Sequence, residues 1–309
     1  MSLGYNHPLY LLPFDHRHSY VSGLFQLDVP LTASQRRAVS ESKQVIYDGF
    51  RHALGGNLTL DNAGLLVDEE FGAAILRDAR RSGYVTALST ERSGSDEFEF
   101  EYGSAFAAHI ETFQPTFAKA LVRYNPEGDA ALNARQANRL KQLSNYCRTV
   151  GQRFMLELLV PATQAQLERS GADQDGYDGS MRPRLLLEAI GALQDADIEP
   201  DIWKIEGLDR REDCERVVAL VRRGGRAAVG CIVLGRHADD ERVASWLRTA
   251  ASVRGFIGFA VGRSTFWDAV SDYLKRRTTR AEAAARIALR YRKWARDFDG
   301  ARHAHSSAA

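Results

Sequence analysis

The segment Phe117–Ala118–Lys119–Ala120–Leu121 (FAKAL) is an apolar run with a lysine at its centre. Side chains point alternately to the two faces of a strand, so Lys119 shares a face with Phe117 and Leu121. The longer run that contains this segment, Phe117–Tyr124, is one of eight apolar, β-rich runs in the chain. The order of these runs along the chain predicts the fold.

Each run is followed by a segment with helical periodicity or by a turn signal. The runs are Leu9–Phe14, Ala63–Val67, Tyr84–Ser89, Phe117–Tyr124, Phe154–Val160, Asp201–Ile205, Ala227–Leu234 and Gly255–Val261. The helical segments are Thr32–Leu54, Glu69–Ser82, Ala130–Val150, Pro183–Asp197, Glu212–Arg223, Asp239–Ser252 and Ser264–Arg277, and the connection Gly94–Glu111 has the weakest helical pattern. Strand followed by helix, repeated without a break in composition, predicts an α/β fold in which a parallel sheet closes into a (β/α)8 TIM barrel.

An open, doubly wound sheet is the alternative α/β fold. It is disfavoured because no G-x-G-x-x-G motif follows the first run, and the absence of any Gly-Lys pair also excludes a P-loop. The length of 309 residues fits one barrel domain over residues 1–300, with an extra helix at Thr279–Arg296. The charges of that helix indicate a solvated face that also offers an interface for a homo-oligomer, and residues 301–309 are expected to form a flexible tail.

The composition excludes several classes of function. Hydrophobic residues make up 44% of the chain, and 41 basic side chains against 40 acidic ones leave a net charge of +1. No broad field is available to hold nucleic acid or a membrane surface, so any anion must be bound locally. Cys147, Cys214 and Cys231 lie far apart, which indicates reduced core thiols of a cytoplasmic protein. The apolar run Pro8–Phe14 is too short for a signal peptide or a membrane span.

A second lysine interrupts an apolar strand. In Ile202–Trp203–Lys204–Ile205–Glu206, alternation places Lys204 on the face of Ile202 and Glu206, and places Trp203 and Ile205 on the other face. Inward residues near the carboxyl ends of barrel strands form the floor of an active site, whereas outward residues meet helices. Lys119 and Lys204 are therefore both predicted to point into the barrel.

These two lysines suggest covalent catalysis. The chain has only six lysines and uses arginine for most of its positive charges, and lysine is the cation that can lose its proton in a desolvated site. Two lysines in one apolar pocket would lower the pKa of one of them, which favours a Schiff base as the electron sink for C–C cleavage. The structural alternative is a strand-end cation paired with a carboxylate, with Glu206 as the nearest candidate for Lys204.

Two carboxylates lie at comparable positions. Asp15 follows the first strand, and Glu157 interrupts the apolar run Phe154–Val160. A buried acid must be paired, so each is either the ion-pair partner of Lys119 or Lys204 or an acid/base group. Both interpretations place the carboxylates beside the lysines.

The last two strands each end in Gly-Arg, at Gly235–Arg236 and Gly262–Arg263. Barrels often bind phosphate at the loops after strands seven and eight, where glycine permits close approach of the anion and a helix begins. No metal site and no cofactor are predicted, because His16 and His18 are not part of an H-E-x-x-H motif and no C-x-x-C occurs. A divalent-metal aldolase that uses barrel histidines stays open as an alternative.

Several strings together resemble one family. They are Leu12-Pro13-Phe14-Asp15-His16-Arg17, Leu66-Val67-Asp68-Glu69-Glu70-Phe71-Gly72, Ala118-Lys119-Ala120-Leu121-Val122-Arg123-Tyr124-Asn125-Pro126, Glu157-Leu158-Leu159-Val160-Pro161, Trp203-Lys204-Ile205-Glu206-Gly207 and Gly258-Phe259-Ala260-Val261-Gly262-Arg263. From about Pro8 to Tyr273 the chain resembles the 5-dehydro-2-deoxyphosphogluconate aldolase domain, known as the carboxyl-terminal half of bifunctional proteins that also contain a 5-dehydro-2-deoxygluconokinase. More distantly it resembles the lysine-dependent tagatose-bisphosphate aldolases.

The resemblance implies that Lys204 forms the Schiff base and that Asp15, Lys119 and Glu157 surround it. The chain departs from the family in two respects. The kinase half is missing, so a separate kinase is expected in the pathway. The segment Thr90-Glu91-Arg92-Ser93-Gly94 carries Arg92 where the family is expected to have lysine, and arginine keeps the charge but not the shape.

The expected protein is a class I aldolase, a lyase of myo-inositol catabolism. It would cleave 2-deoxy-5-keto-D-gluconate 6-phosphate to dihydroxyacetone phosphate and malonate semialdehyde, with Glu157 favoured over Asp15 as general base. Arg17 or Arg92 would meet the substrate carboxylate, and the phosphate would be held by Gly235, Arg236, Gly262 and Arg263. The alternatives are a Schiff-base aldolase for another phosphorylated ketose, of the tagatose or sulfonated-sugar type, and a non-catalytic barrel that binds a sugar phosphate.

Overall fold

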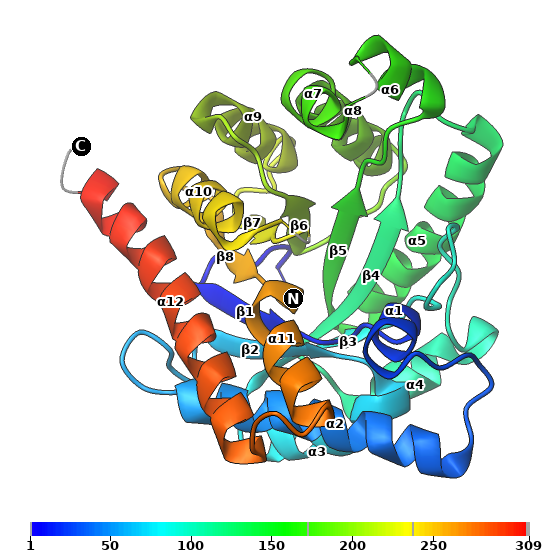
Figure 1. Ribbon diagram of the computed structural model, residues 1–309. Helices are drawn as coiled ribbons and strands as arrows, with labels where there is room; N and C mark the ends of the chain where they lie inside the picture. Colours follow the sequence, from blue (N-terminus) through cyan, green and yellow to red (C-terminus); the bar gives the residue numbers. More distant parts are fainter. Residues whose placement is uncertain (1, 172, 237, 307–309) are drawn as a thin grey trace.

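Eight parallel strands form a closed barrel in which the strands follow chain order and β8 pairs with β1 (Figure 1). The computed structural model describes residues 2–171, 173–236 and 238–306. The strands are β1 (Leu9–Pro13), β2 (Ala63–Val67), β3 (Val85–Ser89), β4 (Phe117–Arg123), β5 (Arg153–Leu159), β6 (Ile202–Glu206), β7 (Gly230–Leu234) and β8 (Phe256–Ala260). The predicted TIM barrel is confirmed, and each strand ends within a few residues of its predicted bounds.

A ring of helices surrounds the barrel (Figure 1). Several begin at side-chain caps, such as Thr32, which forms a capping box with Gln35, and Asp68, which accepts a hydrogen bond from the Phe71 N–H. The helices are α1 (His18–Tyr20), α2 (Ala33–Ala53), α3 (Glu69–Arg81), α4 (Phe106–Phe113), α5 (Ala130–Val150), α6 (Gln164–Arg169), α7 (Gln174–Ser180), α8 (Arg182–Asp195), α9 (Arg211–Val221), α10 (Asp240–Ala251), α11 (Arg263–Leu274) and α12 (Arg280–Ser306), with a π-helical turn at Val21–Phe25 and a 3-10 turn at Gly103–Ala105.

Two connections differ from the prediction. The third, expected as a weak helix over Gly94–Glu111, is irregular until Gly103, and its α-helix α4 begins only at Phe106. The connection after β5 contains two short helices, α6 and α7, that the sequence pattern did not predict. Gly171, Gly176 and Gly179 break the helical periodicity of this segment, so its helices stay short.

Strand side chains divide between the two faces as alternation requires. The outward Trp203 and Ile205 join the large cluster that packs against the helices, whereas Phe117 and Ile202 belong to a separate cluster inside the barrel. This inner cluster also contains Leu9, Leu11, Leu66, Met155 and Ile232. It closes the amino-terminal part of the barrel, and the polar residues of the same inward rows lie nearer the carboxyl ends of the strands.

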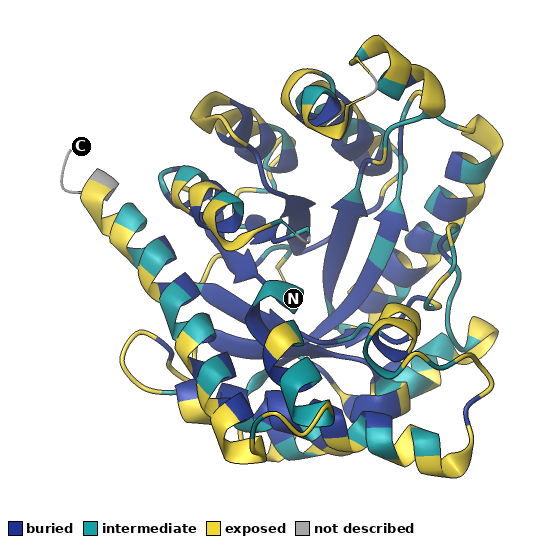
Figure 2. Ribbon diagram, viewed as in Figure 1, coloured by how far each residue is buried: buried dark blue, intermediate teal, exposed yellow. Residues whose placement is uncertain are grey.

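Helix α12 is longer and more deeply integrated than predicted. It continues to Ser306, so residues 301–306, expected as part of a flexible tail, are helical, while residues 307–309 lie outside the described residues. Alanine has the highest helix propensity, and Ala301 packs against the core, so the helix does not end at residue 300. One face is buried along its length and contacts α2, α10 and α11, while the charged face meets solvent (Figure 2). No helix in the described ranges is both long and apolar enough to span a membrane.

Candidate active site

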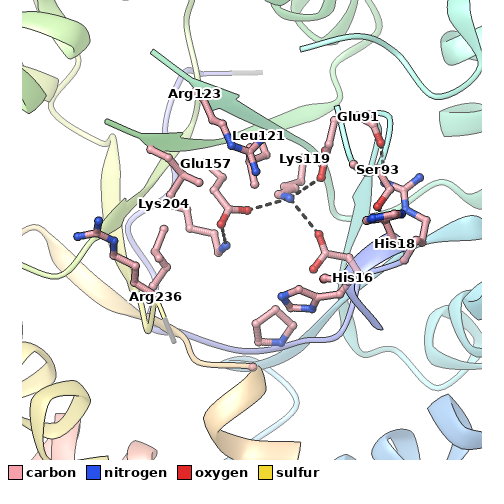
Figure 3. Close-up of a pocket in the computed structure, with 18 of the residues that line it drawn as sticks. His16, His18, Glu91, Ser93, Lys119, Leu121, Arg123, Glu157, Lys204 and Arg236 are labelled. Carbon is pink, nitrogen blue, oxygen red and sulfur yellow. Dashed lines mark hydrogen bonds and ion pairs between the residues drawn. The ribbon is translucent and has the colours of Figure 1, made fainter. Parts of the chain in front are cut away.

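A cavity of about 610 Å³ opens at the carboxyl ends of the strands (Figure 3). This volume is typical of small-molecule sites. All ten of the predicted site residues line it, namely Asp15, Arg17, Arg92, Lys119, Glu157, Lys204, Gly235, Arg236, Gly262 and Arg263. The fold therefore brings together residues that are separated by up to 248 positions in the chain, because parallel strands present their carboxyl ends at one face of the barrel.

Lys119 lies at the centre of a carboxylate cluster. Its Nζ is 2.9 Å from Asp15 Oδ2, 2.6 Å from Glu91 Oε1 and 2.8 Å from Glu157 Oε2. An ammonium group has three N–H donors, and these three acids account for all of them. Lys119 is only 1% exposed, and although burial opposes its charge, Asp15, Glu157 and Glu91 hold the pKa of Lys119 well above its usual value. Lys119 is therefore a fixed cation.

Lys204 has a different environment. Its Nζ forms an ion pair with Glu157 Oε1, and Glu157 is its only polar partner among the described residues. The side chain is buried yet lines the cavity, so the amine faces the site and not bulk solvent. Burial lowers the pKa of Lys204, Glu157 opposes that shift, and the charge of Lys119 adds to it. Of the two lysines, Lys204 is thus the one whose proton is easier to remove.

Glu157 bridges the two lysines. One carboxylate oxygen contacts Lys119 and the other contacts Lys204, because the three residues lie on the inward faces of the adjacent strands β4, β5 and β6. Burial alone would raise the pKa of Glu157, but Lys119 and Lys204 lower it to about 2. The pKa of Asp15 is likewise lowered, against the effect of its burial, chiefly by Lys119. Both acids are ionised at neutral pH, and Glu157 is the one in contact with Lys204.

The two arginines expected to meet a substrate carboxylate are already engaged. Arg17 is 5% exposed and donates to Glu101 Oε2 at 2.6 Å and to the Glu91 carbonyl oxygen at 2.5 Å. Arg92 pairs with Glu99 at 3.2 Å on the outer edge of the cavity, with 63% of its side chain exposed. Arg17 therefore supports the loop that carries Glu91, and Arg92 lies largely in solvent.

The two Gly-Arg pairs also differ. Arg236 forms ion pairs with Asp178 and, at 2.8 Å, with Glu206. Arg263 is the first residue of α11 and has no carboxylate partner within ion-pair distance in the described part of the chain, and burial lowers its pKa to about 10 although Glu157 and Asp15 oppose this. Gly262 precedes it where a Cβ would lie 2.3 Å from the Pro13 carbonyl oxygen, so no side chain fits between β1 and the start of α11.

Sequence reasoning missed several cavity residues. Glu91 lies two residues beyond Ser89, on the inward row of β3, so continuing the alternation past the strand end could have identified it.

Glu206 does not pair with Lys204, as the sequence suggested, but with Arg236. Burial lowers the pKa of His16 to about 4, so this histidine is neutral, and its Nδ1 has no hydrogen-bond partner in the described ranges. Asp178 on α7, which does not line the cavity but pairs with Arg236, had no sequence signal.

A metal centre is not apparent in the described parts of the chain, where no group of three or more His, Cys, Asp or Glu side chains is arranged to hold an ion. Cys147, Cys214 and Cys231 are buried and unbridged, and burial raises the pKa of each thiol. These thiols are therefore core residues and not ligands or nucleophiles.

Comparison with known proteins places the chain in a family. The sequence profile described as "Uncharacterized protein conserved in bacteria (DUF2090)" matches residues 5–302. The chain belongs to the DUF2090 family. No curated protein sequence matches this DUF2090 chain significantly.

Solved structures share its fold. The DUF2090 chain is similar to fructose-bisphosphate aldolase from Plasmodium falciparum, with a TM-score of 0.58 and 12% identity over 94% of this chain and 90% of that one. It is also similar to Cgl0159 from Corynebacterium glutamicum, with a TM-score of 0.55 and 16% identity over 94% of this chain and 88% of that one. At these identities the similarity shows a common barrel.

Proposed function

We propose that this protein is a class I aldolase in which Lys204 forms a Schiff base with the ketone of a phosphorylated ketose. The observation that carries the proposal is the contrast between the two cavity lysines. Three carboxylates surround Lys119, whereas in the described part of the chain Lys204 has only Glu157 as a partner, and its pKa is lowered. A buried, cavity-lining amine beside a fixed cation and a carboxylate is the arrangement that Schiff-base chemistry requires.

The reaction follows from these positions. The neutral Lys204 amine adds to the ketone, and the resulting carbinolamine takes up a proton and loses water to give a protonated imine. Glu157 accepts the proton of the hydroxyl at the carbon beyond the scissile bond, while the electrons of the C–C bond move to the imine. An aldehyde leaves, and the resulting enamine is protonated and hydrolysed to release the ketone and the free lysine.

Lys119 assists the reaction through the positive charge of its ammonium group. Its ammonium lowers the pKa of Lys204 before the amine attacks, and it holds Glu157 and Asp15 in contact with the site. Because its three donors are committed to carboxylates, Lys119 itself is a poor nucleophile. Glu157, in contact with both lysines, is a better candidate for the general base than Asp15, which contacts Lys119 alone.

The start of α11 is the proposed phosphate site. In the described residues Arg263 has no carboxylate partner, and it lies at the amino terminus of α11, where backbone N–H groups favour an anion; Gly262 allows this helix start to pack closely against Pro13 of β1. Gly235 lies at the neighbouring strand end, while Arg236 is already neutralised by Asp178 and Glu206. Arg263 is accordingly the main phosphate ligand, and Arg236 contributes mainly by ordering the rim.

The motif resemblance supports a specific substrate, 2-deoxy-5-keto-D-gluconate 6-phosphate, with dihydroxyacetone phosphate and malonate semialdehyde as products. A kinase reaction would then supply the phosphorylated sugar acid. Turnover of a panel containing this compound and the tagatose- and sulfosugar-type ketoses separates the candidates, with product formation fastest from the true substrate class.

The Schiff base is tested by adding borohydride to the protein with dihydroxyacetone phosphate and mapping the reduced adduct by mass spectrometry. The adduct is expected on Lys204, to be lost in Lys204→Ala, and to persist in Lys275→Ala, which changes a lysine at an exposed position. Retro-aldol turnover should also resist a chelator. Labelling at another lysine defeats the assignment, and turnover that a chelator abolishes favours the divalent-metal alternative.

A further inference from the structure

Arg123 is a cation of the cavity that the proposed reaction does not use. It lies on the inward row of β4, four residues beyond Lys119, and extends from the end of the strand toward the middle of the cavity beside Leu121 (Figure 3). In the described residues its guanidinium makes one hydrogen bond, from Nη1 to the Ser95 carbonyl oxygen at 3.2 Å. Its other donors are available to a ligand.

The other arginines of the cavity put this observation in context. Five arginines line it, and three of them already have carboxylate partners, with Arg17 on Glu101, Arg92 on Glu99, and Arg236 on Asp178 and Glu206. Within the described ranges only Arg123 and Arg263 lack a carboxylate within ion-pair distance. Because both line the cavity, these two cations are available to an anionic ligand.

The two unpaired arginines lie on opposite sides of the cavity. Arg123 ends β4, and Arg263 follows β8 closely, so in a closed ring of eight strands they are four strands apart in either direction. Lys204, on β6, lies between them along one side of the ring. A ligand that reached both arginines would carry its reactive carbon past the Lys204 amine.

Arg123 is also held in place. Its carbonyl oxygen accepts a hydrogen bond of 2.8 Å from Gln136 Nε2, and Gln136 Oε1 accepts one of 2.8 Å from the Phe98 N–H. Gln136 is completely buried, so it fixes the end of β4 to the loop that lines this side of the cavity. These bonds fix the backbone from which the Arg123 side chain extends, and the hydrogen bond to Ser95 is the one that orients its guanidinium in the described residues.

We propose that Arg123 binds a second anionic group of the substrate, at the end opposite the phosphate, and thereby selects ketoses that carry an anion at both ends. The inference rests on the proposed function of this cavity. The planar guanidinium fork matches either a carboxylate or a phosphate, and both are within the proposal. Arg123 thus takes the role that the sequence suggested for Arg17 or Arg92.

The test is direct binding by isothermal titration calorimetry with three acyclic six-carbon probes. Two carry anions at both ends, 6-phosphogluconate with a carboxylate and glucitol 1,6-bisphosphate with a second phosphate, and the third, glucitol 6-phosphate, carries one. The wild-type protein should bind at least one of the two probes with an anionic group at each end about tenfold to a hundredfold more tightly than glucitol 6-phosphate, and Arg123→Gln should remove that advantage without changing the affinity for glucitol 6-phosphate. The probe whose affinity exceeds that of glucitol 6-phosphate identifies the second anionic group as a carboxylate or a phosphate.

Two further variants serve as controls. Arg123→Lys retains the charge but not the planar guanidinium, so it should keep part of the higher affinity for the probes with two anionic groups. Arg148→Gln removes a positive charge from an exposed position near the end of α5 and should leave that higher affinity unchanged. An advantage unchanged in a folded Arg123→Gln, or no advantage in the wild type, overturns the inference. Because calorimetry does not depend on Schiff-base formation, failure of the borohydride adduct on Lys204 is a separate result that would refute the proposed function alone.

Discussion

At the scale of single residues, chemistry in this cavity depends on an asymmetry between two identical side chains. Lys119 and Lys204 are both buried and both contact Glu157. The additional contacts of Lys119 to Asp15 and Glu91 raise its pKa, and its retained charge contributes to the lowered pKa of Lys204. Carboxylates that stabilise one ammonium therefore help, through that ammonium, to make the other a nucleophile.

Replacing the fixed cation should shift the pH dependence of adduct formation. In Lys119→Met the neighbouring positive charge is lost, so the pKa of Lys204 rises and less of its amine is neutral at pH 7. The rate of borohydride trapping with dihydroxyacetone phosphate should fall at pH 7, by about tenfold for each unit by which the pKa rises, and recover at alkaline pH. Trapping rates measured from pH 6 to 10 check this. A profile that coincides with that of the wild type would show that Lys119 does not control Lys204.

At the scale of elements, a buried ion pair fixes the end of β1 that carries Asp15. Lys43 of α2 forms an ion pair with Asp68, and its Nζ also donates to the carbonyl oxygens of Phe14 at 2.8 Å and His16 at 3.0 Å. These carbonyls flank Asp15, and Asp68 caps α3 through the Phe71 N–H at 2.8 Å. One pair thus ties α2, α3 and the β1 loop together beneath the cavity.

A double-mutant cycle on this pair should show strong coupling. Lys43→Met leaves the Asp68 carboxylate buried without its cation and should reduce the free energy of unfolding by about 3–5 kcal/mol, and Asp68→Asn leaves the ammonium unpaired at a similar cost. The double variant has no unpaired charge and keeps a side-chain oxygen for the α3 cap, so it should be at least about 2 kcal/mol more stable than the sum of the single changes. Urea unfolding of the four proteins measures the cycle. Additive costs would mean that the two groups act independently.

The same scale separates what the sequence predicts from what it does not. The apolar runs predict the strands with little error because nearly all strand residues are buried on both faces of the sheet, and against this background the charged residues Lys119, Glu157 and Lys204 are conspicuous. Residues in loops are not surrounded by an apolar run in the sequence, so a charged side chain there is not conspicuous. Alternation places Glu91 and Arg123 on the inward rows of β3 and β4, but their partners depend on how the loops fold back, so periodicity could not assign their contacts.

At the scale of the whole molecule, the carboxyl-terminal helix α12 supports elements that carry cavity residues. Helix α12 buries Ile287, Tyr291, Trp294 and Phe298, and it packs against α2, α10 and α11. Tyr291 donates a hydrogen bond to the Tyr10 carbonyl oxygen on β1, and Trp294 Nε1 donates to Thr265 Oγ1 at 3.0 Å, in the first turn of α11. The helix that carries Arg263 is therefore held from behind by the last helix of the chain.

This arrangement makes stability and anion binding respond together to changes in α12. Trp294→Ala should reduce the free energy of unfolding by about 3–5 kcal/mol, because a completely buried indole is replaced by a cavity and Thr265 loses its donor. Leu289→Ala, at a position that is 61% exposed on the same helix, should change it by less than about 0.5 kcal/mol. Urea unfolding measures both, and calorimetry with glucitol 6-phosphate at a temperature where both variants are folded measures the site. If α12 holds α11 in position as the contacts indicate, Trp294→Ala also weakens binding of glucitol 6-phosphate while Leu289→Ala does not. Equal stability of the two variants would show that α12 is merely appended to the barrel.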